Sequence, residues 1–212
     1  NQYPPMTGVP ALREAISRKI ASLYGHHYNP QNEITITAGA TQALLTAIQC
    51  CVHTDDEVIV IEPAFDSYLP AIALAGGKAV CVQMEVGAAG YTVPWHKIAA
   101  AITTRTRLIL INSPHNPSGS ILRASDLQAL ADIVRGTDIL ILSDEVYEHM
   151  VYDGMQHESV CRHPELAARA FVVSSFGKTY HVTGWKIGYV AAPTELMKEF
   201  HKVHQFLSLI HI

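Results

Sequence analysis

The sequence predicts an α/β fold in which helices flank a doubly wound, mostly parallel sheet of seven strands. The prediction rests on seven short apolar runs rich in β-branched residues and on the helical patterns that separate many of them. Nearly all the runs are continuous rather than alternating, which is typical of strands buried on both faces. They cover residues 34–37, 57–61, 79–83, 108–111, 139–142, 171–173 and 187–191.

Five helical patterns accompany these runs. They cover residues 10–22, 41–51, 66–75, 96–102 and 125–134. In the first, apolar residues recur every four positions from Leu12 to Ile20, and Pro10 suits a first turn. In the last, we expect Ser125 to be the N-cap and Gly136 to end the helix. Because open α/β sheets bind ligands at the carboxyl ends of their strands, we look for functional residues just after each strand.

The composition narrows the class of function. A formal net charge of −4 argues against a nucleic-acid or acidic-membrane surface, and no apolar run is long enough to span a bilayer. Because the chain opens on Asn1-Gln2-Tyr3-Pro4-Pro5, we expect no signal peptide. Its 4 cysteines show neither CxxC spacing nor a disulfide framework, which indicates reduced thiols in a cytoplasmic protein. No histidine pattern has HExxH spacing, so we expect no metal site.

The first two strands are followed by residues suited to a phosphate and a flat ring. Gly39, Ala40 and Thr41 form a small-residue turn that opens a helix, and such a turn presents free N–H groups and the positive end of the helix dipole to an anion. The alternative is an ordinary turn with Thr41 as N-cap. After the second strand, Phe65 can stack on a flat ring, or it can be a core residue.

Two later loops carry polar residues in constrained positions. Two prolines and a glycine stiffen residues 112–119 and fix where Asn116 points. Asp144 ends the fifth apolar run, where its carboxylate would be largely desolvated and would need a cationic partner. Tyr147 lies three residues further on, so that both side chains can face one crevice. A helix N-cap is the alternative role for Asp144.

The sixth run leads to Lys178. A lysine among small and apolar residues can supply the neutral amine that a Schiff base with an aldehyde requires, although most lysines are simply solvated. Ser175 and Lys186 lie nearby in the sequence and add contacts suited to a phosphate. Together the loops predict one ligand with a phosphate, a flat ring, a phenolate oxygen, a cationic ring nitrogen and an aldehyde. Pyridoxal phosphate (PLP) has all five features.

The same residues form motifs that resemble the class I and II aminotransferases, which are fold-type I PLP enzymes. The motifs are Asn116-Pro117-Ser118-Gly119, Asp144-Glu145-Val146-Tyr147, Ser175-Phe176-Gly177-Lys178 and Gly184-Trp185-Lys186. The chain is most similar to the kynurenine and methionine aminotransferases within that family, which share its Asn-Gln-Tyr opening, its Glu-Pro-x-Phe-Asp block and its Gly-Trp-Lys segment. In this subgroup Lys186 stands where the wider family has a phosphate-binding arginine.

The resemblance implies roles for individual residues. Lys178 would form the Schiff base and transfer protons, and Asp144 would keep the PLP ring nitrogen protonated. Asn116 and Tyr147 would hydrogen-bond the phenolate oxygen. The family is homodimeric with shared active sites, so Tyr3 would reach the phosphate of a neighbouring subunit. The resemblance also predicts cis peptide bonds before Pro63 and Pro117.

We expect residues 1–206 to form the PLP-binding large domain. By comparison with the family, an N-terminal arm and a C-terminal small domain would be missing, together with the arginine that binds the substrate carboxylate. Residues 207–212 no longer resemble the family, and we expect them to be a non-native tail.

The expected activity is transfer of an amino group from methionine, an aromatic amino acid or kynurenine to a 2-oxo acid. Three alternatives remain open from the sequence. The protein could be a PLP carbon–sulfur β-lyase, because the same carbanion can expel a β-substituent. It could be the aminotransferase-like, PLP-sensing domain of a transcription regulator. It could also be an inert fragment that binds PLP without turnover.

Overall fold

The computed structural model describes residues 5–87 and 90–207. Tyr3 and residues 208–212, most of the expected tail, lie outside the described residues, whereas Leu207 ends the last helix. Seven strands form the main sheet, and each of the seven predicted runs is one of them. The strands are β1 (Ile34–Thr37), β2 (Glu57–Glu62), β3 (Lys78–Gln83), β6 (Thr106–Asn112), β7 (Leu140–Asp144), β8 (Ala170–Ser175) and β9 (Gly188–Ala191).

The order of the strands across the sheet is β1-β9-β8-β7-β6-β2-β3. β8, β7, β6, β2 and β3 are parallel, whereas β9 runs antiparallel to both of its neighbours, β8 and β1. This confirms the predicted α/β class with a mostly parallel sheet. Since two antiparallel steps restore direction, β1 points the same way as β8. The carboxyl ends of all strands except β9 therefore lie at one edge.

Helices correspond to all five predicted patterns. They are α1 (Pro10–Tyr24), α2 (Gly39–Cys51), α3 (Tyr68–Leu74), α4 (Trp95–Ala101) and α5 (Ala124–Val134). The structure adds elements that the pattern did not predict. These are the hairpin β4 (Glu85–Gly87) and β5 (Gly90–Thr92), the short helices η1 (Val160–Arg162), α6 (Pro164–Ala167), α7 (Phe176–Thr179) and η2 (Thr183–Trp185), and α8 (Thr194–Leu207). Within the described ranges, no helix has the length and apolar character needed to cross a membrane.

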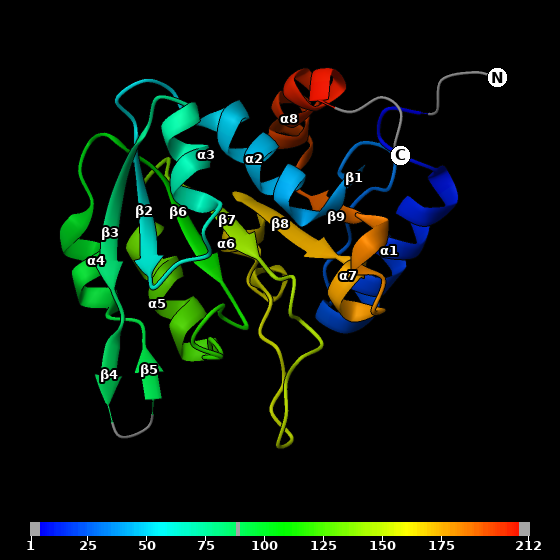
Figure 1. The fold of residues 1–212 in the computed structure, drawn as a ribbon. Helices are drawn as coiled ribbons and strands as arrows, with labels where there is room; N and C mark the ends of the chain where they lie inside the picture. The colour runs from blue at the N-terminus through cyan, green and yellow to red at the C-terminus, as the bar shows by residue number, and fades with distance from the viewer. Residues whose placement is uncertain (1–4, 88–89, 208–212) are drawn as a thin grey trace.

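Helices cover both faces of the main sheet (Figure 1). On one face α2, α3 and α8 pack against strand residues such as Val58 and Val60. On the other face α1, α4, α5 and α6 pack against the alternate residues, such as Ile59 and Ile61. Successive residues of a strand point to opposite faces, so a strand covered on both sides is apolar throughout. This is the physical reason why the strand runs are continuous in the sequence.

One predicted helix start is wrong, and so is the alternative in which Thr41 is an N-cap. Ser125 lies inside α5, and the backbone N–H of Arg123 is instead bonded by Asp126 Oδ2 at 2.8 Å. Asp126 thus supplies the acceptor at the helix start that we had assigned to Ser125. Thr41 is not the N-cap of α2, because the helix already begins at Gly39.

Candidate active site

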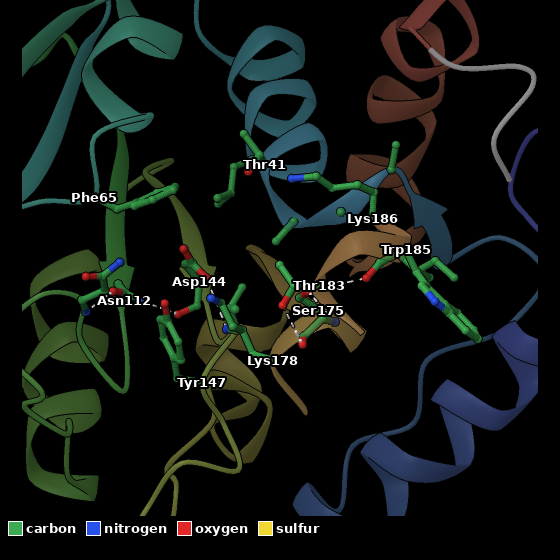
Figure 2. Close-up of a pocket in the computed structure, with 18 of the residues that line it drawn as sticks. Thr41, Phe65, Asn112, Asp144, Tyr147, Ser175, Lys178, Thr183, Trp185 and Lys186 are labelled. Carbon is green, nitrogen blue, oxygen red and sulfur yellow. Dashed lines mark hydrogen bonds between the residues drawn. The ribbon is translucent and has the colours of Figure 1, made fainter. Parts of the chain in front are cut away.

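A cavity of about 750 Å³ lies at the carboxyl ends of the strands, where α/β sheets bind ligands. Every predicted site residue within the described part of the chain lines it, as Figure 2 shows for most of them. These residues are Gly39, Ala40, Thr41, Phe65, Asn116, Asp144, Tyr147, Ser175, Lys178 and Lys186. They come from five different strand ends, so the fold alone brings them together. Tyr3 lies outside the described residues.

One end of the cavity is suited to an anion. Gly39 has a φ of 81°, a conformation that glycine adopts without strain, and it begins the 13-residue helix α2. A helix start carries partial positive charge. Lys186 borders the same turn, because a Cβ placed on Gly39 would lie 4.0 Å from Lys186 Cδ. Ser175 caps α7 by accepting a hydrogen bond of 3.1 Å from the N–H of Gly177. These groups, called the anion cradle below, could hold a phosphate.

Asp144 is the buried acid of the cavity, with 5% of its surface exposed. Its Oδ2 accepts a hydrogen bond of 2.6 Å from the Tyr68 hydroxyl, and its Oδ1 accepts one of 3.2 Å from the N–H of Val146. Burial raises the pKa of Asp144 to about 6, although the Tyr68 hydrogen bond acts in the opposite direction. Among the described residues no cation pairs with Asp144. The described residues therefore do not supply the expected cationic partner, and the position is open to a cationic group of a ligand.

Asn112 is a site residue that the sequence reading missed. It ends β6, lines the cavity, and donates a hydrogen bond of 2.9 Å from Nδ2 to the carbonyl oxygen of Asp144. Its Oδ1 accepts one of 2.7 Å from the N–H of Asn116. One amide thus ties the Asn116 loop to the end of β7. The peptide bonds before Pro63 and Pro117 are cis as expected, and the bond before Pro114 is also cis.

Lys178 is half-buried on the four-residue helix α7. Its Nζ lies 5.8 Å from the centre of the Tyr147 ring, and both side chains border the cavity next to Asp144 (Figure 2). Burial, and then the charge of Asp144, raise the pKa of the Tyr147 phenol, so it is a hydrogen-bond donor at neutral pH. An amine, a phenol and a buried carboxylate therefore converge on one space.

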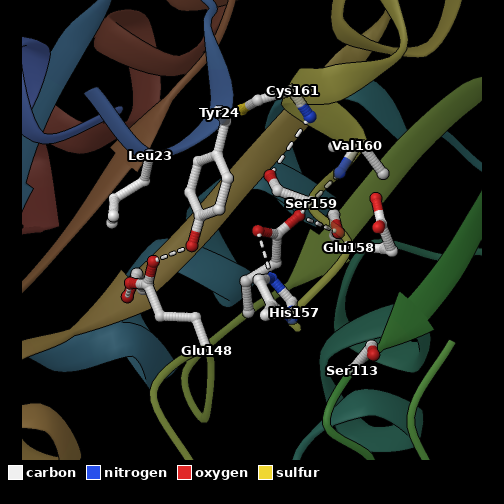
Figure 3. A network of polar contacts seen from close by, with 12 residues as sticks. Leu23, Tyr24, Ser113, Glu148, His157, Glu158, Ser159, Val160 and Cys161 are labelled. Carbon is white, nitrogen blue, oxygen red and sulfur yellow. Dashed lines mark hydrogen bonds and ion pairs between the residues drawn. The ribbon is translucent and has the colours of Figure 1, made fainter. Parts of the chain in front are cut away.

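A second buried carboxylate, Glu148, lies just after Tyr147 in the sequence and connects this region to its neighbours. It forms an ion pair of 2.5 Å with Lys19 and accepts hydrogen bonds of 2.6 Å from Tyr24 and from Ser174. The Tyr24 hydroxyl points at Glu148 in Figure 3. Burial opposes ionisation of Glu148, but Lys19 and the hydroxyl donors hold its pKa below the usual range. These contacts join α1 to the segment after β7 and to the end of β8.

Glu145 is the third carboxylate in this region. Its Oε2 lies 2.9 Å from His157 Nε2, and its Oε1 accepts hydrogen bonds from Ser143 at 2.9 Å and from the N–H of Val160 at 3.1 Å. His157 lies in this network in Figure 3. The long loop after Tyr147 is thereby fastened to the end of β7. This role was not predicted, because His157 and Val160 lie 12 and 15 positions from Glu145 along the chain.

Comparison with known proteins agrees with this geometry. A profile of the family "Aminotransferase class I and II" matches residues 1–209. The chain belongs to this family. Methionine aminotransferase of Escherichia coli (strain K12) is 50% identical over 208 residues, covering 98% of this chain and 53% of that protein. Kynurenine–oxoglutarate transaminase 1 of Mus musculus is 37% identical, covering 97% of this chain and 50% of that protein.

Solved aminotransferase structures share the fold as well. The crystal structure of YbdL from Escherichia coli, reported with a methionine aminotransferase function, superposes with a TM-score of 0.95 at 49% identity. The match covers 99% of this chain and 55% of that chain. The chain thus spans about half the length of the curated relatives it matches. These findings confirm the resemblance to the methionine and kynurenine aminotransferases.

Proposed function

We propose that the full-length protein is a PLP-dependent aminotransferase and that this chain supplies its cofactor pocket. The observation that carries the proposal is that an amine (Lys178), a buried carboxylate with no cationic partner among the described residues (Asp144) and an anion cradle line one cavity of about 750 Å³. PLP needs all three, because it has an aldehyde, a ring nitrogen that becomes cationic and a phosphate. Burial of the Asp144 carboxylate costs desolvation energy, and a cationic group of a ligand would offset that cost.

Each group of the cofactor has a matching residue. Gly39, Ala40, Thr41, Ser175 and Lys186 would hold the phosphate. Phe65 would cover one face of the ring. Asn116 and Tyr147 would donate hydrogen bonds to the phenolate oxygen, and Asp144 would pair with the ring nitrogen. The bound cofactor supplies an electron sink that stabilises negative charge at Cα of an amino acid.

Residues of this chain would transfer the proton of the substrate's Cα. Lys178 Nζ would take the proton from Cα of the amino-acid substrate as a general base and return it as a general acid. Its half-buried position next to Tyr147 would keep the amine inside the cavity where the substrate would bind. Asp144, held as an anion, preserves the positive charge on the ring nitrogen. Proton movement and charge stabilisation are thus assigned to different residues.

We propose methionine, an aromatic amino acid or kynurenine as the amino donor and a 2-oxo acid as the acceptor. The similarity to relatives named for methionine and kynurenine supports this choice. We further propose that the protein is a cytoplasmic homodimer in which Tyr3 contributes to the neighbouring site. The four free cysteines are compatible with a reducing compartment.

The test uses the full-length protein incubated with PLP and then reduced with borohydride. Mass spectrometry should find the cofactor's mass on the peptide that carries Lys178, and amino exchange between methionine and a 2-oxo acid should be measurable. Lys178→Ala should lose both signals, whereas Lys198→Ala, which alters an exposed lysine, should retain both. Cofactor attached to another lysine would contradict the proposal. Release of pyruvate, ammonia and a thiol from a cysteine S-conjugate, without amino exchange, would favour the β-lyase.

A further inference from the structure

Tyr68 touches two of the residues assigned to the cofactor ring. It is the first residue of α3, and only 2% of its surface is exposed. Its hydroxyl donates a hydrogen bond of 2.6 Å to Asp144 Oδ2. Its ring packs edge-on against the Phe65 ring, with centroids 5.6 Å apart and an interplanar angle of 76°. One buried side chain therefore contacts both the aromatic cover and the acid.

The orientation of Asp144 depends on few donors. One carboxylate oxygen is held by the backbone N–H of Val146 and the other by Tyr68. The backbone donor belongs to the same segment as Asp144, so it cannot fix that segment relative to α3. The Tyr68 hydroxyl thus joins the acid to the start of α3, and the Tyr68 ring contacts Phe65 in the turn just before that helix.

We propose that Tyr68 is a positioning residue of the cofactor site. Its one side chain fixes the Asp144 carboxylate and the Phe65 ring relative to each other. The inference rests on the PLP-binding function proposed above. Tyr68 does not itself line the cavity, so it acts on a ligand only through the two residues it contacts.

The electrostatic part of this role follows from the groups around Asp144. Tyr68 faces it from α3, Glu145 and Tyr147 lie on its own segment, and Lys178 borders the same cavity from α7. Burial favours the neutral acid, and the Tyr68 hydrogen bond favours the anion. Without the hydroxyl, Asp144 would be neutral up to a higher pH. A neutral acid cannot pair with a cationic ring nitrogen.

The experiment compares the full-length wild-type protein with Tyr68→Phe, which keeps the ring packing and removes only the hydroxyl. Two quantities are measured from pH 5 to 9: the Kd for PLP, and the ¹³C shift of the Asp144 carboxyl in the cofactor-free protein. In Tyr68→Phe the Asp144 titration should move up by about one pH unit, so PLP should bind about tenfold more weakly near pH 5 and about twofold more weakly near pH 7. Tyr28→Phe, which alters a hydroxyl that is equally buried elsewhere, should leave both unchanged.

A double-mutant cycle separates positioning from a merely structural effect. In an Asp144→Asn background the Tyr68→Phe substitution should no longer change the pH dependence of PLP binding, because the titrating partner is gone. If wild type and Tyr68→Phe give overlaying titrations and equal Kd values, this inference is wrong while the proposed function stands. If wild type fails to bind PLP at any pH, both are wrong.

Discussion

Gly188 packs directly against Ala40: a Cβ placed on Gly188 would lie 2.7 Å from the Ala40 nitrogen. The same Cβ would lie 2.7 Å from the carbonyl carbon of Gly39 and 3.0 Å from the Ser174 oxygen. All three are backbone atoms, so no side chain can swing aside to make room. The first residue of β9 thus sets how closely the turn assigned to the phosphate approaches the sheet.

Gly188→Ala should therefore displace that turn. We expect the free energy of unfolding to fall by about 1–3 kcal/mol or more, with weaker PLP binding, as measured by urea titration and by cofactor fluorescence. Gly87→Ala is the matched control, because nothing lies within 4 Å of its added Cβ. Equal stability and equal PLP affinity for the two variants would show that the contact does not constrain the turn.

The ion pair between Lys19 and Glu148 should respond asymmetrically to mutation. Glu148 is 2% exposed and Lys19 is 22% exposed. Lys19→Met leaves a buried carboxylate without its cation, which costs roughly 3–5 kcal/mol of stability. Glu148→Gln leaves an amine that can still reach water, so we expect a smaller loss of roughly 1–3 kcal/mol. Denaturant titrations would measure both, with the exposed Lys198→Met as control; the reverse order would contradict this reading.

Asp144 should lower the free energy of unfolding of the cofactor-free protein at neutral pH. Its pKa is raised from 3.8 to about 6 in the folded state, so the folded protein binds the extra proton between these values. The contribution of this group to the free energy of unfolding then falls by about 3 kcal/mol as the pH rises from about 4 to 6. Asp144→Asn should accordingly melt higher than wild type at pH 8 when PLP is absent, and the difference should shrink towards pH 4. A constant difference across this range would argue against the raised pKa.

Tyr147→Phe isolates the role proposed for the phenol. The ring next to Lys178 Nζ remains, and only the hydroxyl assigned to the phenolate oxygen is lost. We expect kcat to fall about tenfold, with stability nearly unchanged, because one hydrogen bond to a charged oxygen disappears. Steady-state kinetics would measure the loss, and Tyr152→Phe, at a residue 72% exposed, provides the control. Equal kcat values would remove the phenol from the mechanism.

Much of the fold was readable from local sequence. A strand covered on both faces must be apolar throughout, so runs such as 57–61 and 171–173 predicted their strands. The direction of β9 was not readable, because it depends on contacts with β1 from the far end of the chain. Helix α7 has only four residues and cannot show a helical period. Helix α8 was not predicted, although Met197, Phe200 and His204 repeat on its buried face.

Some residues of the candidate site could likewise be predicted from local sequence, and others could not. Lys178 and Asp144 could be identified because each follows an apolar strand at the edge where ligands bind. Tyr68 could not, because it meets Asp144 across 76 positions of sequence and looks like an ordinary apolar residue of α3. Glu148 was missed for a similar reason: its partners Lys19 and Ser174 are 129 and 26 positions away. Local patterns reveal the groups facing the ligand better than those that hold them.

The pairing of β1 with β9 also bears on the order in which the site is built. Among the described residues β1 pairs with no strand other than β9, which comes last in sequence among the seven strands of the main sheet. During synthesis, β1 therefore waits as an unpaired strand until Gly188–Ala191 has emerged from the ribosome. Since β1 leads into the Gly39–Thr41 turn, that end of the pocket is completed last. Nascent chains halted before β9 should retain the β2–β3–β6–β7–β8 layer and lack a finished anion cradle.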